Sequence, residues 1–386
     1  MMRLTREQEA LAAGREGIAL GLAMKTLIAY GEAFGAQRMV PIKSAHVAVS
    51  FGIGFISAMY RILERLTAEG VKVRVPTSVN PRPGRELGLK NKFAFMHQKK
   101  LEQMLDALGV MPNYSCVCYE DVNVPGLGDR LCWSESSAVQ YANSVLGART
   151  NRNSLLIDLC GAVTGYAPEF GYMLDENRRG RMLVRLNIDK MDASALGFVL
   201  GKRVVDKVPV LEHYDFSKSE LKNMGGAMAA SGGIAMFHVE GLTPEAPDIK
   251  TASGGSPETE ITITQGDIDA LCNKGEADMV VMGCPQMSFE EAIALAPYFI
   301  GKRITVPTWF CMVPSAQQRF ASSPLCAELL ASGVVVQTCC PVAALSIGQG
   351  MGKKRILTSS GKCFYYLEGT QYGNIDDCLR VCGVLS

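Results

Sequence analysis

The sequence has few of the features that mark membrane, secreted or nucleic-acid-binding proteins. Its charges nearly cancel, with 39 Lys and Arg against 38 Asp and Glu, so no basic surplus attracts nucleic acid or an anionic membrane. Its apolar runs are broken by Gly, Ser or charged residues before the ~20 residues that a membrane-spanning helix needs. The first residues form a charged helical pattern rather than a signal peptide. We therefore expect a cytoplasmic protein that binds neither membrane nor nucleic acid.

Several common ligand-binding motifs are also missing. The sequence contains no G-x-G-x-x-G dinucleotide motif, no Walker loop and no G-x-S-x-G nucleophile elbow. It has no paired C-x-x-C spacing, which argues against a ferredoxin or zinc-ribbon site. Of its four histidines, only His46 stands in a polar cluster, KSAH, at the end of a predicted strand. Any chemistry must therefore come from residues that the fold brings together.

Cysteine, in contrast, is abundant, with 13 in 386 residues. The number is odd, and a reducing cytoplasm disfavours disulfides. Most of the thiols lie in apolar helical patterns, where Cys is a small hydrophobic residue. Cys116, Cys284 and Cys340 differ because each follows a predicted strand in a turn. From residue pattern alone, these three are either metal ligands or incidental core thiols.

Predicted strands and helices alternate along nearly the whole chain, which indicates α/β units with mostly parallel sheets. The length suits two or three domains. Polar residues or thiols follow several predicted strands, beginning with those at 39–42 and 71–76; these clusters read KSAH, PTSVN, YSCVC, MGCPQ, TCCP and LTSSGK. Because α/β proteins bind ligands where their strands end, the clusters together predict a site.

Segment 114–154 concentrates the most chemistry. It holds Cys116 and Cys118, the polar turn WSESS, and two arginines, Arg149 and Arg152, within one loop–helix–loop. This combination suits a metal bound beside a small anion. The plain alternative is a buried loop with incidental cysteines and a polar helix end.

These blocks resemble the large subunit of aconitase X, a dehydratase branch of the aconitase superfamily. WSESSA and ANSVLGARTNR are the most specific, and LTREQE, PIKSAHV, VPTSVNP, LDENRRG, FHVEGLTPE, GCP and CPV stand in the family order around them. The resemblance covers nearly the whole chain. It implies an aconitase-like α/β fold with several three-layer α/β/α domains and mostly parallel sheets around a central cleft. We expect two regions, 1–205 and 206–386, with the swivelling domain carried by a separate small subunit.

The resemblance also implies a ligand set and a substrate site. Cys116, Cys284 and Cys340 would hold an iron–sulfur cluster, with 4Fe–4S expected first and 2Fe–2S or mononuclear iron as alternatives. Cys340 matches rather than Cys339, because the family cysteine directly precedes Pro, and Cys118 falls where the family has Pro. The catalytic residues implied are Ser134, Ser136 and His46. The substrate-binding residues implied are Lys43, Ser44, Asn80, Arg149, Asn151, Arg152, Ser359, Ser360 and Lys362.

The implied reaction is the dehydration of a small hydroxy acid similar to mevalonate 5-phosphate or cis-3-hydroxy-L-proline. An open iron would act as a Lewis acid on the leaving hydroxyl, and Lys43, Arg149 and Arg152 would hold the carboxylate. The base would be a serine of the small subunit. Two alternatives stay open: an iron–sulfur scaffold subunit whose chemistry was lost or changed, and a metal-free dehydratase or isomerase. Cys118 and Phe364 depart from the family pattern and leave the substrate open.

Overall fold

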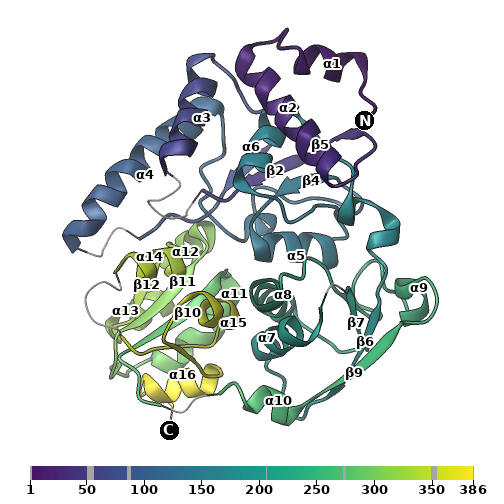
Figure 1. The fold of residues 1–386 in the computed structure, drawn as a ribbon. Helices are drawn as coiled ribbons and strands as arrows, with labels where there is room; N and C mark the ends of the chain where they lie inside the picture. Colours follow the sequence, from purple (N-terminus) through teal and green to yellow (C-terminus); the bar gives the residue numbers. More distant parts are fainter. Residues whose placement is uncertain are drawn as a thin grey trace.

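The computed structural model describes residues 2–49, 56–84, 88–205, 207–272, 275–348 and 354–385, and its elements form three groups that follow one another along the chain (Figure 1). The first group contains a three-stranded parallel sheet in the order β3-β2-β4 and an antiparallel pair, β1-β5. Helix α6 packs on β2 and against α2. The elements are α1 (Arg6–Ala12), α2 (Ile18–Ala33), β1 (Met39–Pro41), β2 (Ser44–Val47), α3 (Ile56–Ala68), β3 (Thr77–Val79), α4 (Gly88–Leu108), β4 (Leu131–Trp133), α5 (Ser136–Ser144), α6 (Leu155–Thr164) and β5 (Tyr166–Pro168).

Two strands of this group differ from the prediction. Residues 39–41 form β1, but the polar block that follows is itself the central strand β2, and the second strand begins at Thr77 rather than at residue 71. All four residues of β2 are buried although two of them are polar. Neighbouring strands supply the hydrogen bonds that these side chains need, because Trp133 donates to Ser44 and Ser78 bonds His46.

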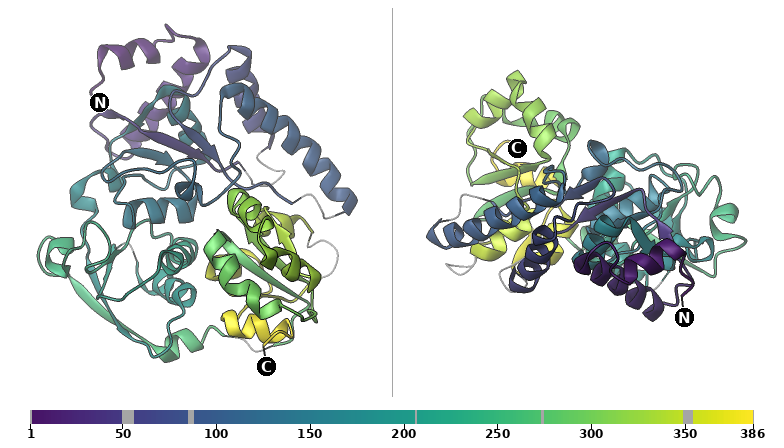
Figure 2. Two further views of the ribbon diagram at one scale, coloured as in Figure 1. Left: turned by 180° about the vertical axis from the view of Figure 1, so that it is seen from behind. Right: turned by 90° about the horizontal axis from the view of Figure 1, so that it is seen from above.

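The second group contains a four-stranded parallel sheet in the order β8-β7-β6-β9. Its helices α7 and α8 pack against each other, and α8 also packs on α5 of the first group (Figures 1 and 2). The expected boundary after residue 205 lies between β6 and β7, which are neighbours in this sheet; the division into two regions stays a prediction. The elements are β6 (Met182–Asn187), α7 (Ala193–Arg203), β7 (Pro209–Leu211), α8 (Lys218–Gly232), β8 (His238–Val239), α9 (Ile249–Ser253), β9 (Thr259–Thr264) and α10 (Gln265–Asp269).

The third group contains a five-stranded parallel sheet in the order β12-β11-β10-β13-β14. The predicted fold class, α/β with mostly parallel sheets, is therefore confirmed. The elements are β10 (Met279–Met287), α11 (Phe289–Leu295), β11 (Thr308–Met312), α12 (Pro314–Ala321), α13 (Pro324–Ala331), β12 (Val335–Gln337), α14 (Pro341–Gly348), β13 (Ile356–Thr358), α15 (Gly361–Tyr366), β14 (Thr370–Tyr372) and α16 (Ile375–Val381).

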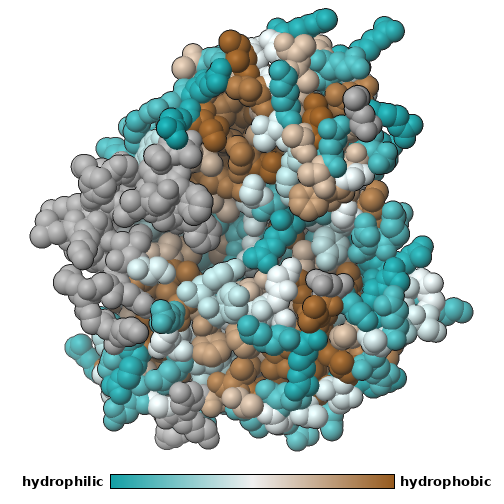
Figure 3. All heavy atoms as spheres, viewed as in Figure 1, coloured by the Kyte–Doolittle hydropathy of each residue, from teal (hydrophilic) through white to brown (hydrophobic). Residues whose placement is uncertain are grey.

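The described residues form two large hydrophobic cores, one of which joins the groups. One lies in the first group, and the other runs from α5 through the second group into the third. On the face seen in Figure 3, polar side chains are interspersed with apolar patches, one group near the top and another in the lower part of the view. Within the described parts of the chain, no helix combines the length and the hydropathy of a membrane span.

Candidate active site

The ends of strands from the first and third groups converge on one cavity of about 140 Å³. A single buried water needs only about 10–15 Å³ of such space, so this cavity has room for a larger group. Ala48, Asn80 and Ser134 enter it directly after β2, β3 and β4, Cys284 comes from β10, and Cys340 follows β12. The lining residues are Ala48, Asn80, Pro81, Cys116, Ser134, Glu135, Ser136, Arg152, Gly283, Cys284, Gln286, Cys340, Pro341, Val342, Lys362 and Tyr366.

All three predicted thiol ligands face this cavity, and Gln286 ties their segments together. Its backbone N–H donates to Cys116 Sγ at 3.4 Å, and its side-chain oxygen accepts from the Cys116 N–H at 3.2 Å. Its amide nitrogen donates to the carbonyls of Met312 at 3.1 Å and Thr338 at 3.0 Å, which belong to the β11 and β12 segments. Gln286 was not predicted, although it stands two residues after Cys284. It fixes the loop of Cys116 against the third sheet.

The two alternative thiols lie elsewhere. Cys118 is fully buried in the core beside Val117 and Tyr119. Cys339 interacts with Cys311 inside the hydrophobic cluster of the third group. Neither thiol lines the cavity. The geometry therefore supports the choice of Cys340, which stays a prediction.

The thiol set suits a bound iron–sulfur group better than a single ion. Among the residues that the structure describes, no three His, Cys, Asp or Glu side chains stand close enough to hold one metal ion. In a cluster, thiolates bind different iron atoms and can stand further apart. Two of the sulfurs already accept backbone N–H bonds, Cys116 from Gln286 and Cys340 from Ala343 at 3.4 Å. Such bonds stabilise thiolate sulfur, so the residues present fit a cluster held by three cysteines.

These thiols are protonated in the metal-free protein. Burial, with a contribution from the Glu135 carboxylate, raises the pKa of Cys116 to about 12. Burial and the neighbouring Cys284 raise the pKa of Cys340 as well. Iron binding requires thiolates, so loading a cluster here must release protons.

A buried ion pair stands beside the thiols. The Lys362 ammonium contacts the Glu135 carboxylate and donates to Ser137 Oγ at 3.2 Å. Burial opposes charge on Glu135, but the Lys362 charge and hydrogen bonds from Ser137 and Ala138 hold its pKa below the usual value. Burial opposes charge on Lys362 too, and Glu135 raises its pKa above the usual value. The pair is therefore ionised at neutral pH.

Lys362 was predicted and Glu135 was not. Glu135 lies in the middle of WSESSA, and its side chain accepts the Ala138 N–H at 2.7 Å as the N-cap of α5. An acidic side chain at a helix start is normally explained by capping. The sequence therefore gives no sign that Glu135 also pairs with Lys362.

Asn80 lines the cavity, and the predicted catalytic residue His46 lies behind it. His46 Nε2 is 2.7 Å from Asn80 Oδ1, and Nδ1 is 2.7 Å from Ser78 Oγ. An amide oxygen can only accept, so Nε2 carries the hydrogen and Nδ1 accepts from Ser78. Burial lowers the pKa of His46, which keeps the ring neutral in this role. His46 thus orients Asn80 and does not itself line the cavity.

Ser134, Ser136 and Arg152 also line the cavity as predicted. Ser134 Oγ is buried, and no described residue gives it a hydrogen-bond partner of normal geometry. Arg152 is exposed and donates to the Ala229 carbonyl at 3.0 Å, which holds it at the mouth. The cavity therefore offers hydroxyl, amide and guanidinium donors around the thiols.

Other predicted binding residues lie outside the cavity. Lys43 is exposed, and Ser44 accepts a hydrogen bond from Trp133 Nε1 at 3.3 Å. Ser360 caps α15, accepting the Cys363 N–H at 3.0 Å, and its hydroxyl bonds the Cys284 carbonyl. Ser359 and Ser360 line a second cavity between the second and third groups, which Cys284 also borders. Through its bond to the Cys284 carbonyl, Ser360 supports the segment of that thiol.

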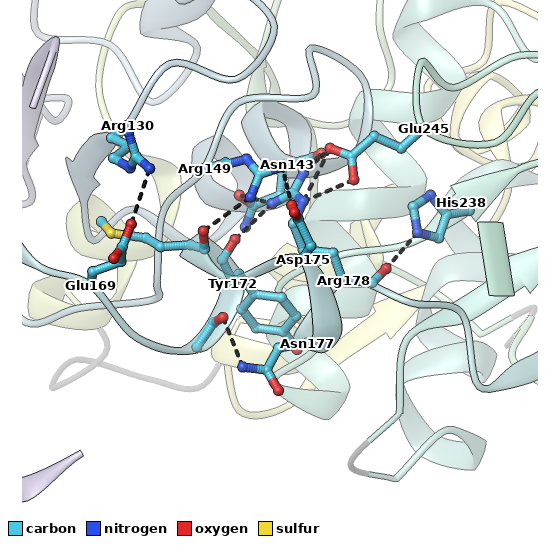
Figure 4. A network of polar contacts seen from close by, with 12 residues as sticks. Arg130, Asn143, Arg149, Glu169, Tyr172, Asp175, Asn177, Arg178, His238 and Glu245 are labelled. Atoms are coloured by element: carbon cyan, nitrogen blue, oxygen red, sulfur yellow. Dashed lines mark hydrogen bonds and ion pairs between the residues drawn. The ribbon is translucent and has the colours of Figure 1, made fainter. Parts of the chain in front are cut away.

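The ANSVLGARTNR block mainly joins segments of the fold. Arg149 pairs with Asp175 and donates to the Met173 carbonyl at 3.0 Å (Figure 4). Asn151 donates to the Phe170 carbonyl at 2.9 Å and accepts the Tyr172 N–H at 2.9 Å. Of the residues predicted to bind substrate in this block, only Arg152 reaches the cavity.

The LDENRRG and FHVEGLTPE blocks meet in the same network. The buried Arg178 bonds the Glu245 carboxylate and donates to the Tyr172 and Asn143 carbonyls, each at 3.0 Å (Figure 4). His238 lies 2.7 Å from the Arg178 carbonyl. These blocks are therefore explained by contacts between the first and second groups and not by the cavity.

Comparison with known proteins places the chain among characterised relatives. Family models match it in succession: the aconitase X first domain over residues 1–176, the second domain over 180–273 and the third domain over 277–383. The phosphomevalonate dehydratase large subunit of Methanosarcina mazei is 34% identical over 396 residues, with 98% of this chain and 96% of that protein covered. The cis-3-hydroxy-L-proline dehydratase of Pseudomonas aeruginosa is 32% identical over 392 residues, with 95% and 67% covered.

A solved structure shows the same arrangement in three dimensions. The crystal structure of Thermococcus kodakaraensis aconitase X in its holo-form matches with a TM-score of 0.87 and 32% sequence identity. The match covers 98% of this chain and 99% of that one. The predicted aconitase-like architecture is therefore confirmed.

Proposed function

This chain belongs to the aconitase X family, and from that we propose that it is the large subunit of a dehydratase acting on a small hydroxy acid in the cavity bounded by Cys116, Cys284 and Cys340. The observation that carries the proposal is the convergence of these three thiols, from segments far apart in sequence, beside the Lys362–Glu135 pair. A core of incidental thiols has no reason to share one polar cavity. The names of the relatives support a dehydratase.

We infer that the three thiols hold an iron–sulfur cluster when it is bound. The cluster would supply an iron with an open position, and such a Lewis acid stabilises the charge that develops on a leaving hydroxyl. Lys362 places a fixed positive charge next to the thiols, which stabilises their thiolate forms. Gln286 holds the Cys116 loop in place against the β10, β11 and β12 segments.

The polar lining has separate tasks toward the substrate. Arg152, at the mouth, can hold a carboxylate or phosphate by two parallel hydrogen bonds. His46 holds the Asn80 amide oxygen, which fixes the orientation of an amide that lines the cavity where a substrate oxygen would lie. Ser134 and Ser136 add hydroxyl donors where negative charge develops as the α-proton leaves. Preorganised donors of this kind need no reorganisation during the reaction.

The substrate class and the partner follow from the relatives. We propose a substrate like those named for them, mevalonate 5-phosphate or cis-3-hydroxy-L-proline. Several relatives are named large subunits, which supports a small-subunit partner. The base is assigned to a serine on that subunit.

A dehydratase assay tests this function. The chain is purified anaerobically with its small subunit, and formation of the conjugated unsaturated acid is followed with both candidate substrates. We expect turnover by the wild type. In Cys284→Ala, turnover should fall by at least about 100-fold, because loss of a proposed cluster ligand should cost at least as much activity as loss of a residue that only supports a ligand. Cys326→Ala is the matched control, since Cys326 is also buried but lies on α13, away from the cavity.

Two results would count against the proposal. Equal turnover in Cys284→Ala and wild type would show that the Cys284 thiol is not needed for the reaction. An iron-loaded complex that converts neither substrate would favour the alternative of a scaffold subunit.

A further inference from the structure

Asp158 is a buried carboxyl that the proposed chemistry does not yet use. It is the only charged residue of α6, whose sequence is LLIDLCGAVT, and its side chain is fully buried. Placing a carboxyl in such surroundings costs free energy unless hydrogen bonds compensate. Here the compensation is poor: Oδ1 accepts from Asn153 Nδ2 at 3.3 Å, and Oδ2 has no partner of normal geometry among the residues that the structure describes. Packing alone gives no reason for an acid at this position.

The neighbour of Asp158 on the cavity side is Ser134. Ser134 lines the cavity, and within the described part of the chain its buried Oγ also has no hydrogen-bond partner of normal geometry. The two side chains are close enough for the Ser134 hydroxyl to act on the Asp158 carboxyl. Two incompletely bonded polar groups are thus neighbours, Ser134 in the cavity wall and Asp158 on α6. Buried polar groups without partners are uncommon, and each calls for an explanation.

We propose that Asp158 is a positioning residue that sets the direction of the Ser134 hydrogen bond, so that Ser134 donates into the cavity while Asp158 is protonated. The inference rests on the proposed function, because the recipient of that hydrogen bond is the substrate anion. A protonated carboxyl donates to Ser134 Oγ, which leaves the serine hydrogen free to point at the substrate. A carboxylate can only accept, so Ser134 would then donate backward and its contribution in the cavity would be lost.

The protonation state supports this arrangement. Burial raises the pKa of Asp158 to about 8, against the lowering effect of hydrogen bonds from Ser134, Cys132 and Asn153. The titratable groups that face it are Tyr30 on α2, Cys132 on β4 and Cys160 on its own helix. All three are acids, and burial raises the pKa of each. None of them supplies the positive charge that would ionise Asp158, so it is neutral at pH 7.

The pH profile of the complex gives the first test. We expect wild-type kcat to fall about tenfold per pH unit once Asp158 ionises, because one proton is lost. Asp158→Asn keeps a donor toward Ser134, so it retains activity at neutral pH and loses this alkaline decline. Asp158→Leu loses about 10–100-fold at every pH, as removal of a supporting hydrogen bond does. Ile157→Val, on the same helix, is the control and should keep the wild-type profile.

An infrared measurement tests the inference without turnover. In pH-difference spectra of the purified chain, wild type should show a protonated carboxyl band that titrates in the alkaline range. Asp158→Asn should lack this band, and Ser134→Ala should shift it. If the wild-type complex is inactive, the proposed function fails. The spectra still show whether Asp158 is protonated and interacts with Ser134. An alkaline decline that persists in Asp158→Asn, or spectra in which the variants match wild type, would overturn the role of Asp158.

Discussion

Lys362 is almost completely buried, with 9% of its side chain exposed, and Glu135 is its compensating charge. A buried ion pair does not itself guarantee stability, because removing both charges from water is costly. Removing one partner is different, since the other charge stays buried without compensation. We therefore interpret the pair by its position: it keeps a cation next to three thiols, which explains why the protein retains two charges that are costly to bury.

Lys362→Met tests this at the residue scale. We expect the free energy of unfolding to fall by about 3–5 kcal/mol, because Glu135 loses its partner. Lys100→Met is the control; it breaks an exposed pair with Glu64, 57% and 49% exposed, which contributes about 0–1 kcal/mol. Chemical denaturation at pH 7 gives both values. Equal small losses in the two variants would contradict the buried-pair account.

The same variant has a pH signature. Because Lys362 and hydrogen bonds lower the pKa of Glu135 in the folded protein, their stabilisation is fully present above the unfolded value of about 4.3. It is lost as the pH falls through the folded-state pKa. The difference between Lys362→Met and wild type should therefore shrink in acid.

Residue patterns alone singled out the three turn cysteines of the cavity, because thiols are unusual at such positions. The family resemblance added five other residues that line it: Asn80, Ser134, Ser136, Arg152 and Lys362. Glu135 and Gln286 were missed, since one looks like a helix cap and the other depends on contacts 170 residues away, with Cys116. Conversely, Arg149 and Asn151, which the resemblance implies bind substrate, make contacts between loops and do not line the cavity. Residue type alone does not show which polar partner a side chain will find.

Helices α7 and α8 show how glycine sets the distance between two elements. A Cβ on Gly197 would lie 2.1 Å from the Met224 carbonyl oxygen, and one on Gly232 would lie 2.0 Å from the Gly201 oxygen. The backbones therefore touch where the helices cross. Next along α8, Gly226 faces Pro285, the residue after Cys284. The position of α8 therefore affects the cavity, because Pro285 lies between Cys284 and Gln286, which both line it.

Gly197→Ala should show this dependence. Alanine normally stabilises a helix interior by about 0.5–1 kcal/mol relative to glycine, but here its methyl group must push α8 away. We expect a net loss of about 1–3 kcal/mol, as for overpacking. Gly266→Ala is the control, because the nearest atom to its Cβ is Thr264 Oγ1 at 3.8 Å. Thermal unfolding measures the stability of both variants. A Gly197→Ala protein as stable as Gly266→Ala would contradict this dependence.

The alternation of elements predicted parallel sheets correctly, but element boundaries were less accessible. The strand expected at 71–76 begins at Thr77, and the polar SAHV segment is a buried central strand. A strand with Ser and His reads as a loop until its neighbours are known. Its stability depends on hydrogen bonds from β3 and β4, which come from distant sequence.

At the scale of the whole molecule, two parallel sheets place the ends of their strands at one cavity, and α8 of the second group supports it. This arrangement explains why three thiols 168 and 56 residues apart, those of Cys116, Cys284 and Cys340, can line one cavity. No local spacing records such a meeting, because it depends on how the groups pack. The expectation that these three segments come together came from the family resemblance. The match to the aconitase X structure confirms the fold.

The central claim is that Cys116, Cys284 and Cys340 together hold an iron–sulfur cluster. It is tested most directly by iron and acid-labile sulfide content, with an electronic spectrum, on anaerobically purified chains. Wild type and Cys326→Ala should contain both elements in similar amounts, and Cys284→Ala should lose them while remaining folded. A folded wild type without iron, or a Cys284→Ala chain with undiminished iron and sulfide, would contradict the claim.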